Sequence, residues 1–166
     1  IRGDGLENVA KRWRSEWECR GELRRNLPGA ILLAVGINDT ARIGRQDGRP
    51  QLSTEAFKFG LEALLKQIKK EAIVMVLGLT PVNEKQMPFA NCLWYSNKSC
   101  SNYERLIEEC CLEYDVPFLP TFQEMRNNSS CNSWIMHDGI HLNSLGHNWI
   151  YKKVLQWQSL NNWVDS

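Results

Sequence analysis

The sequence lacks several features that mark whole classes of proteins. It has no apolar run long enough to cross a bilayer, so no membrane span is predicted. Acidic and basic residues nearly balance, and the net charge of +1 predicts no general affinity for nucleic acid or anionic membranes. There is no internal repeat, linker or low-complexity tract. With 43% hydrophobic and 23% charged residues, the sequence predicts one globular domain over residues 1–166.

Cysteine pairs with metal-binding or redox spacing are also absent. The six cysteines form no Cys-x-x-Cys motif. In a chain of this size they are more typical of reduced thiols than of a disulfide framework, although Cys92 and Cys100 flank a loop and could pair in an oxidising compartment. We therefore expect a cytoplasmic protein.

What the sequence does contain is an alternation of apolar runs and helical patterns. Strands alternating with helices predict a parallel sheet with helices on both faces. The run at 30–35 is typical of a strand that is buried on both faces. The other predictions are strands at 73–77 and 116–119, helices at 6–25, 53–70, 103–114 and 145–157, a helical turn at 122–125 and an irregular stretch at 81–97.

A first polar motif, Gly36-Ile37-Asn38-Asp39, directly follows the strand predicted at 30–35. The carboxyl ends of parallel strands face the ligand crevice of such a sheet. Gly36 allows a sharp turn, and the carboxamide of Asn38 offers N–H donors that could stabilise a developing oxyanion. The alternative is that Asn38, Asp39 and Thr40 only form a turn or cap a helix.

A second polar motif places Asp138 three residues before His141. The carboxylate could hold one imidazole nitrogen while the other nitrogen takes a proton from a nucleophile. The alternative is an Asp-Gly turn followed by a surface histidine. A metal site built from His137, Asp138 and His141, with Cys131 nearby, is a rival, but adjacent residues rarely point at one ion, and we predict no metal.

With both motifs in this order and Gly3-Asp4-Gly5 near the start, the sequence resembles the SGNH (GDSL) hydrolases, a family of esterases and lipases. The resemblance covers nearly the whole chain but only three of the family's four sequence blocks. It implies a three-layer α/β/α sandwich with a flavodoxin-like parallel sheet. It also implies that Gly3 and Asn38 are oxyanion donors and that Asp138 and His141 are the catalytic pair.

The missing block is the one that carries the family's nucleophilic serine. No serine of the chain lies in a Gly-Asp-Ser context. Gly5 is not expected to replace that serine, because only two residues precede Gly3 and one helix plus one strand separate Gly3 from Asn38, as suits the second block. We expect the serine and the first strand on a segment of about 40 residues upstream of Ile1. Without that segment, or an N-terminal fragment that supplies it, residues 1–166 should fold poorly.

The activity implied by the resemblance is hydrolysis of carboxylic esters by a Ser-His-Asp mechanism, with no cofactor. The expected partner is a small-molecule or lipid-like ester, and Ile37, Trp94 and Trp134 are candidates for contacting it. O-acyl transfer would use the same residues. A non-catalytic binding module is the rival of a different class, but the presence of Asn38, Asp138 and His141 together favours an enzyme.

Overall fold

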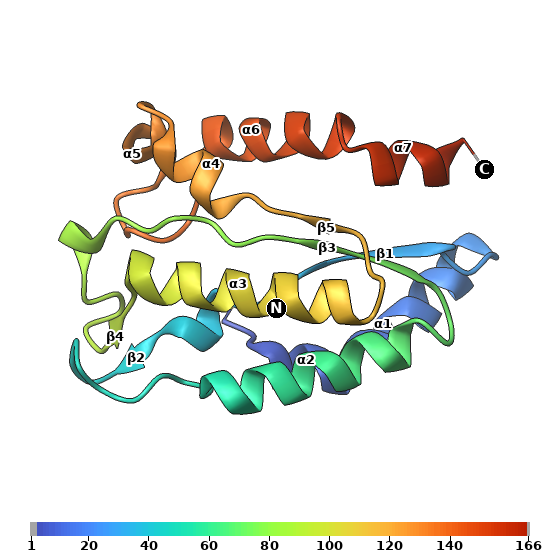
Figure 1. Ribbon diagram of the computed structural model, residues 1–166, viewed down its shortest axis with the longest axis horizontal. Coiled ribbons are helices and arrows are strands. Elements are labelled where there is room, and N and C mark those ends of the chain that lie inside the picture. Colours follow the sequence, from blue (N-terminus) through green and yellow to red (C-terminus); the bar gives the residue numbers. More distant parts are fainter. Residues whose placement is uncertain (1–2, 166) are drawn as a thin grey trace.

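The centre of the protein is a three-stranded parallel sheet (Figure 1). The structure is a computed structural model that describes residues 3–165. The strands β1 (Ala30–Ala34), β3 (Ile73–Leu77) and β5 (Phe118–Leu119) lie side by side in that order. β3 is central and pairs with all five residues of β1. Each parallel connection runs through helices, as such pairing requires.

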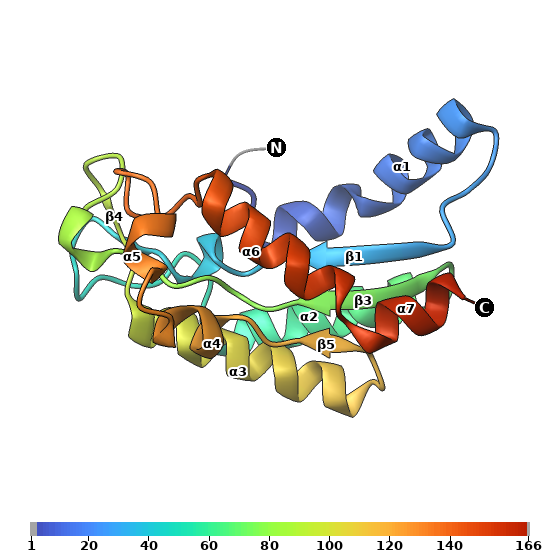
Figure 2. The same cartoon turned by 90° about the horizontal axis from the view of Figure 1, so that it is seen from above.

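Helices cover both faces of this sheet. On one face lie α1 (Leu6–Arg24), α2 (Thr54–Ile68) and α3 (Asn97–Glu113), and on the other lie α6 (Ser144–Leu155) and α7 (Gln158–Val164) (Figures 1 and 2). The short helices α4 (Phe122–Asn127) and α5 (Cys131–Trp134) follow β5. The α/β/α sandwich expected from the sequence is confirmed.

The main core lies between the sheet and the layer formed by α1, α2 and α3. Helix α2 begins where Ser53 caps it, its hydroxyl accepting from the Ala56 N–H. The apolar side chains of α2 recur at helical spacing, and the largest of them are fully buried. Burying one such side chain stabilises the fold by about 1.5–3 kcal/mol. The core residues of α2 are Phe57, Leu61, Leu64, Leu65 and Ile68.

The expectation that residues 30–35 are buried on both faces is wrong. Leu33 is 5% exposed, but its neighbour Leu32, which points to the opposite face, is 46% exposed. The face of β1 that carries Leu32 is therefore only partly covered. Within residues 3–165, β1 is also an edge strand, with one strand partner, β3. The other edge of β1 therefore presents backbone groups without a ladder partner.

The stretch at 81–97, expected to be irregular, contains two short elements. These are the 3₁₀ turn η2 (Glu84–Gln86) and β4 (Leu93–Trp94), which pairs antiparallel with β2 (Arg42–Ile43). Helix α3 also begins earlier than expected, because the Ser96 hydroxyl caps it by accepting from the Ser99 N–H. Over residues 3–165, no helix is long and apolar enough to cross a membrane.

Candidate active site

The pair of Asp138 and His141 forms as the sequence predicts. Asp138 Oδ2 lies 2.7 Å from His141 Nδ1. The other oxygen, Oδ1, accepts from the backbone N–H groups of Ile140 and His141, both at 3.0 Å. The loop is closed where the Met136 N–H donates to the His141 carbonyl at 2.7 Å. The Asp-Gly turn and the carboxylate-imidazole pair, posed as alternatives, are therefore two parts of one structure.

These contacts set the charge of Asp138. Partial burial alone would raise the pKa of its carboxyl, but the hydrogen bonds from Ile140 and from the ring and backbone of His141 outweigh it, and the pKa is lowered. The carboxylate is thus ionised at neutral pH. The His141 side chain is 55% exposed, and within residues 3–165 its Nε2 makes no hydrogen bond.

Asn38 lies in the 3₁₀ turn η1 (Asn38–Thr40), just beyond the carboxyl end of β1. Gly36, at φ +120°, makes the turn out of the strand, a conformation that favours glycine. Asn38 Nδ2 donates to the Asp4 carbonyl at 3.0 Å, and Asn38 Oδ1 accepts from the Tyr95 hydroxyl at 3.2 Å. A primary amide carries two N–H groups, so one remains for a ligand.

Asp39 ties the same turn to the start of α1. Its two carboxylate oxygens accept from the Leu6 N–H at 3.0 and 3.1 Å. Asp39 therefore caps a helix, as the alternative for Asn38, Asp39 and Thr40 held. The helix is α1, whose first residue, Leu6, is 33 positions away in sequence. A Cβ on Gly5 would lie 2.6 Å from Asp39 Oδ1, so this close approach requires glycine at position 5. The presence of glycine at position 5 thus has a structural explanation that does not involve a nucleophile.

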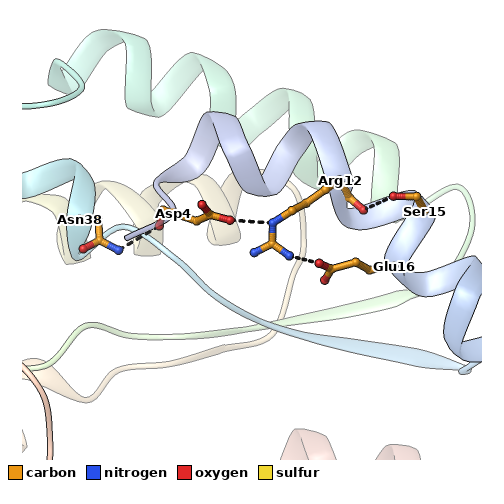
Figure 3. Close-up of polar contacts among 5 residues, drawn as sticks. All are labelled: Asp4, Arg12, Ser15, Glu16 and Asn38. Atoms are coloured by element: carbon orange, nitrogen blue, oxygen red, sulfur yellow. Dashed lines mark hydrogen bonds and ion pairs between the residues drawn. The ribbon is translucent and has the colours of Figure 1, made fainter. Parts of the chain in front are cut away.

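The loop that carries Gly3 and Asp4 is held from the other side by α1. Arg12 Nε donates to Asp4 Oδ2 at 2.7 Å, and Arg12 also pairs with Glu16 one turn further along the helix (Figure 3). The same view shows Asn38 reaching the Asp4 carbonyl. The segments of the two predicted oxyanion donors, Gly3 and Asn38, are therefore side by side.

The predicted substrate residues do not share one cavity. A pocket of about 230 Å³ at the carboxyl ends of β1 and β3 is lined by Ile37 and Asn38, with His147 of α6 opposite. Trp94 lies in β4 opposite Arg42, and among the described residues its buried indole Nε1 has no hydrogen-bond partner. Trp134 packs on Trp149 of α6, with ring centroids 5.8 Å apart. Of the three, only Ile37 is among the residues that line this pocket.

One side chain that contacts the site, Tyr95, was not predicted from the sequence. Tyr95 contacts Asn38 across 57 residues of sequence, and no local pattern signals such a contact. Phe89 contacts both Tyr95 and His141, its ring centroid 6.3 Å from the first ring and 6.0 Å from the second.

The described part of the chain contains no group of three His, Cys, Asp or Glu side chains that could hold a metal ion. The alternative set of His137, Asp138, His141 and Cys131 is therefore not assembled. Also within residues 3–165, no serine or threonine hydroxyl is hydrogen-bonded to His141. The expected position of a nucleophilic serine, upstream of Ile1, lies outside the described residues.

Comparisons with known proteins were made for both the sequence and the fold. Residues 1–149 match the GDSL-like lipase/acylhydrolase family. A search of curated proteins gives no match. Among solved structures, the lipase/acylhydrolase from Enterococcus faecalis is similar with a TM-score of 0.74 at 16% identity, over 93% of this chain and 70% of that one.

Two esterases have similar folds. An acetyl xylan esterase has a TM-score of 0.69 at 15% identity, over 93% of this chain and 76% of that one. The psychrotrophic esterase from Pseudoalteromonas sp., in a structure inhibited by monoethylphosphonate, has a TM-score of 0.61 at 14% identity, over 99% and 75%. At such identities the likeness shows the fold. Because the family match extends over nearly the whole sequence and the fold agrees, the chain belongs to the GDSL-like lipase/acylhydrolase family.

Proposed function

We propose that the protein hydrolyses carboxylic esters by a Ser-His-Asp mechanism. Membership of a lipase/acylhydrolase family supports ester hydrolysis in general. The observation that carries the mechanism is the 2.7 Å contact between Asp138 Oδ2 and His141 Nδ1. It fixes the imidazole so that Nε2 can take the proton of a serine hydroxyl, and it stabilises the imidazolium that forms.

The oxyanion hole in this proposal uses Gly3 and Asn38. The Gly3 N–H makes no hydrogen bond within residues 3–165, and Asn38 keeps one N–H that Asp4 does not use. Two hydrogen bonds fix the loop of Gly3 relative to the turn of Asn38: Asn38 donates to the Asp4 carbonyl, and the Leu6 N–H donates to Asp39. Donors fixed in advance cost no reorganisation when the oxyanion forms, which is why they lower the barrier.

We place the nucleophilic serine on a segment upstream of Ile1 that adds a parallel strand to the free edge of β1. A groove of about 370 Å³ runs between α1 and β1, lined by Trp13, Trp17 and the residues of β1. A strand in this position would pair the open backbone of β1. Its carboxyl end would then reach the pocket beside Asn38.

The reaction then proceeds in two steps. The serine oxygen attacks the ester carbonyl as its proton passes to His141, and the tetrahedral oxyanion is bound by the Gly3 and Asn38 donors. His141 returns the proton to the departing alcohol, leaving an acyl-serine. Water, deprotonated by His141, then attacks the acyl-serine. The acid is released as His141 returns this proton to the serine oxygen.

For the substrate, we propose a small or lipid-like ester whose acyl group contacts Ile37 at the pocket. Trp94 and Trp134 remain candidates for contacts further out, on β4 and α5. All six cysteines are free thiols, which supports the cytoplasmic location that we propose for the protein.

The test is hydrolysis of p-nitrophenyl esters of short and long acids by the full-length protein. The variant His141→Ala should lose at least about 1,000-fold in kcat. The matched control is His137→Ala, an exposed histidine in the same loop, which should stay within about threefold of the wild type. Activity retained in His141→Ala would overturn the mechanism, and a wild type without turnover would favour a binding module. Adding an alcohol acceptor separates hydrolysis from acyl transfer.

A further inference from the structure

The hydrogen bonds of Asn38 leave one orientation for its carboxamide. The Asp4 carbonyl can only accept, so the nitrogen of Asn38 must face it, at 3.0 Å. The oxygen of the amide then faces the Tyr95 hydroxyl, 3.2 Å away, which donates to it. The remaining N–H of Asn38 is therefore fixed in direction by two contacts, one from the Gly3-Asp4-Gly5 loop and one from Tyr95.

Tyr95 is itself firmly held. It is 4% exposed and belongs to a buried cluster with Ala41, Val82, Phe122 and Ile140. Its ring meets the ring of Phe89 edge-on, at an interplanar angle of 84°. The residue stands between β4 and the cap of α3, and its backbone N–H contacts Met87 Sδ at 3.3 Å. Its hydroxyl thus has little freedom to leave Asn38.

The chemistry of the phenol also suits a donor. Burial, with smaller effects from Cys100 and Asp39, raises the pKa of Tyr95 to about 12. The hydroxyl therefore keeps its proton throughout the pH range in which an esterase works. A hydrogen bond to the amide oxygen also draws electron density from the amide nitrogen, which strengthens the remaining N–H as a donor.

We propose that Tyr95 is a positioning residue for ester hydrolysis: its hydroxyl holds the Asn38 carboxamide so that the free N–H is directed at the oxyanion. This inference rests on the proposed function, because it assumes that Asn38 binds the oxyanion. The same buried cluster contains Ile140, next to His141, and packs against Ile37, next to Asn38. Tyr95 thereby lies where the two catalytic loops meet.

The test is Tyr95→Phe in the full-length enzyme, since phenylalanine keeps the ring and removes only the hydroxyl. We expect kcat to fall by about three- to tenfold, as for the loss of one neutral hydrogen bond, with KM unchanged. The matched control is Tyr103→Phe. Tyr103 is 3% exposed and also donates its hydroxyl, to the Leu52 carbonyl, but it has no contact with Asn38, so its kcat should stay at the wild-type value.

A double-mutant cycle separates positioning from a general structural effect. In the Asn38→Ala background, Tyr95→Phe should cause no further loss of kcat, because the amide that it positions is gone. In NMR spectra of the full-length protein, the side-chain amide signals of Asn38 should shift in Tyr95→Phe and not in Tyr103→Phe. The NMR readout needs no turnover.

The outcomes distinguish the two proposals. If Asn38→Ala leaves kcat unchanged, the proposed oxyanion hole fails, and the role of Tyr95 fails with it. If Asn38→Ala lowers kcat but Tyr95→Phe does not, the oxyanion hole stands and the positioning role is overturned. The same conclusion follows if Tyr95→Phe lowers kcat by the same factor in the wild type and in Asn38→Ala. Amide signals of Asn38 that do not move in Tyr95→Phe would overturn it as well, even if that variant lost activity.

Discussion

The carboxylate of Asp138 contacts both the ring and the backbone of His141. Oδ2 lies 2.7 Å from the ring Nδ1, and Oδ1 accepts from the backbone N–H of the same residue at 3.0 Å. One carboxylate therefore shapes the turn that presents the histidine and also fixes the orientation of its ring. Any substitution at Asp138 has to be judged on both functions.

Asp138→Asn separates these two functions. An asparagine Oδ1 can still accept from Ile140 and His141, so the turn should be kept. Its NH₂ group, however, would face Nδ1 and favour the wrong tautomer of the ring, with no charge to stabilise the imidazolium. We expect kcat for ester hydrolysis to fall by about 10,000-fold while the melting temperature changes little.

The control for Asp138→Asn is Asp47→Asn. Asp47 is exposed and forms a surface ion pair with Arg45, so the same chemical change should leave kcat unaltered. An Asp138→Asn variant that retains a tenth or more of the wild-type kcat would contradict the role assigned to the carboxylate.

Asn38→Ala removes one donor of the proposed oxyanion hole. Losing such a donor typically costs about 100- to 1,000-fold in kcat, because the donor acts mainly in the transition state. The measurement is kcat and KM on one p-nitrophenyl ester, and KM should change much less than kcat. Asn132→Ala, at an exposed position of α5, is the control and should be neutral. A rise in KM alone would assign Asn38 to ground-state binding instead.

Gly5→Ala should destabilise the protein through a single contact. The added methyl group would lie 2.6 Å from Asp39 Oδ1, so either the cap on Leu6 or the start of α1 must shift. We expect a loss of about 1–3 kcal/mol in the free energy of unfolding, measured by urea denaturation. In the control Gly29→Ala, the new methyl group would lie at an ordinary 3.5 Å from the Trp163 ring. Equal losses in the two variants would show that the close approach at Gly5 is not what matters.

Asp39 makes the stability depend on pH. Burial, partly offset by the Leu6 N–H, raises its pKa from 3.8 to about 6. Between these values the folded protein holds a proton that the unfolded chain has released. The stabilisation from this proton is therefore complete below pH 3.8 and is lost as the pH rises through 6. It contributes at most about 3 kcal/mol to the free energy of unfolding.

Asp39→Asn removes this titration and keeps an oxygen that can cap Leu6. The unfolding free energy of the variant minus that of the wild type should increase from pH 4 to pH 7 and then level off. The pKa of Glu104 is also raised by burial, but its contribution to the free energy of unfolding is the same in both proteins and cancels in the difference. A difference that stays flat or decreases over this range would refute the assignment.

The sequence predicted those parts of the fold that depend on local pattern. The core spacing of α2, the apolar run of β3 and the caps around them are local signals, and both elements lie where they were expected. The pairing of β2 with β4 was missed because two-residue strands have no periodicity, and their register depends on contacts about 50 residues apart. Likewise, α7 follows α6 without an apolar pattern of its own.

The same distinction holds at the site. Asp138 and His141 are close in sequence, so their contact could be expected from spacing alone. Asn38 was found because it follows an apolar strand. Its partner Tyr95 could not be found in this way, since the two residues lie 57 positions apart in sequence. The adjacent Trp94 was predicted instead, as a contact for the substrate.

The most direct test of the account is to find the nucleophile. The full-length protein is treated with a fluorophosphonate, and the modified peptide is identified by mass spectrometry. We predict one labelled serine, on the upstream segment proposed above, and loss of labelling in His141→Ala but not in His137→Ala. Labelling of a serine within residues 1–166, or undiminished labelling in His141→Ala, would contradict the mechanism proposed for this protein.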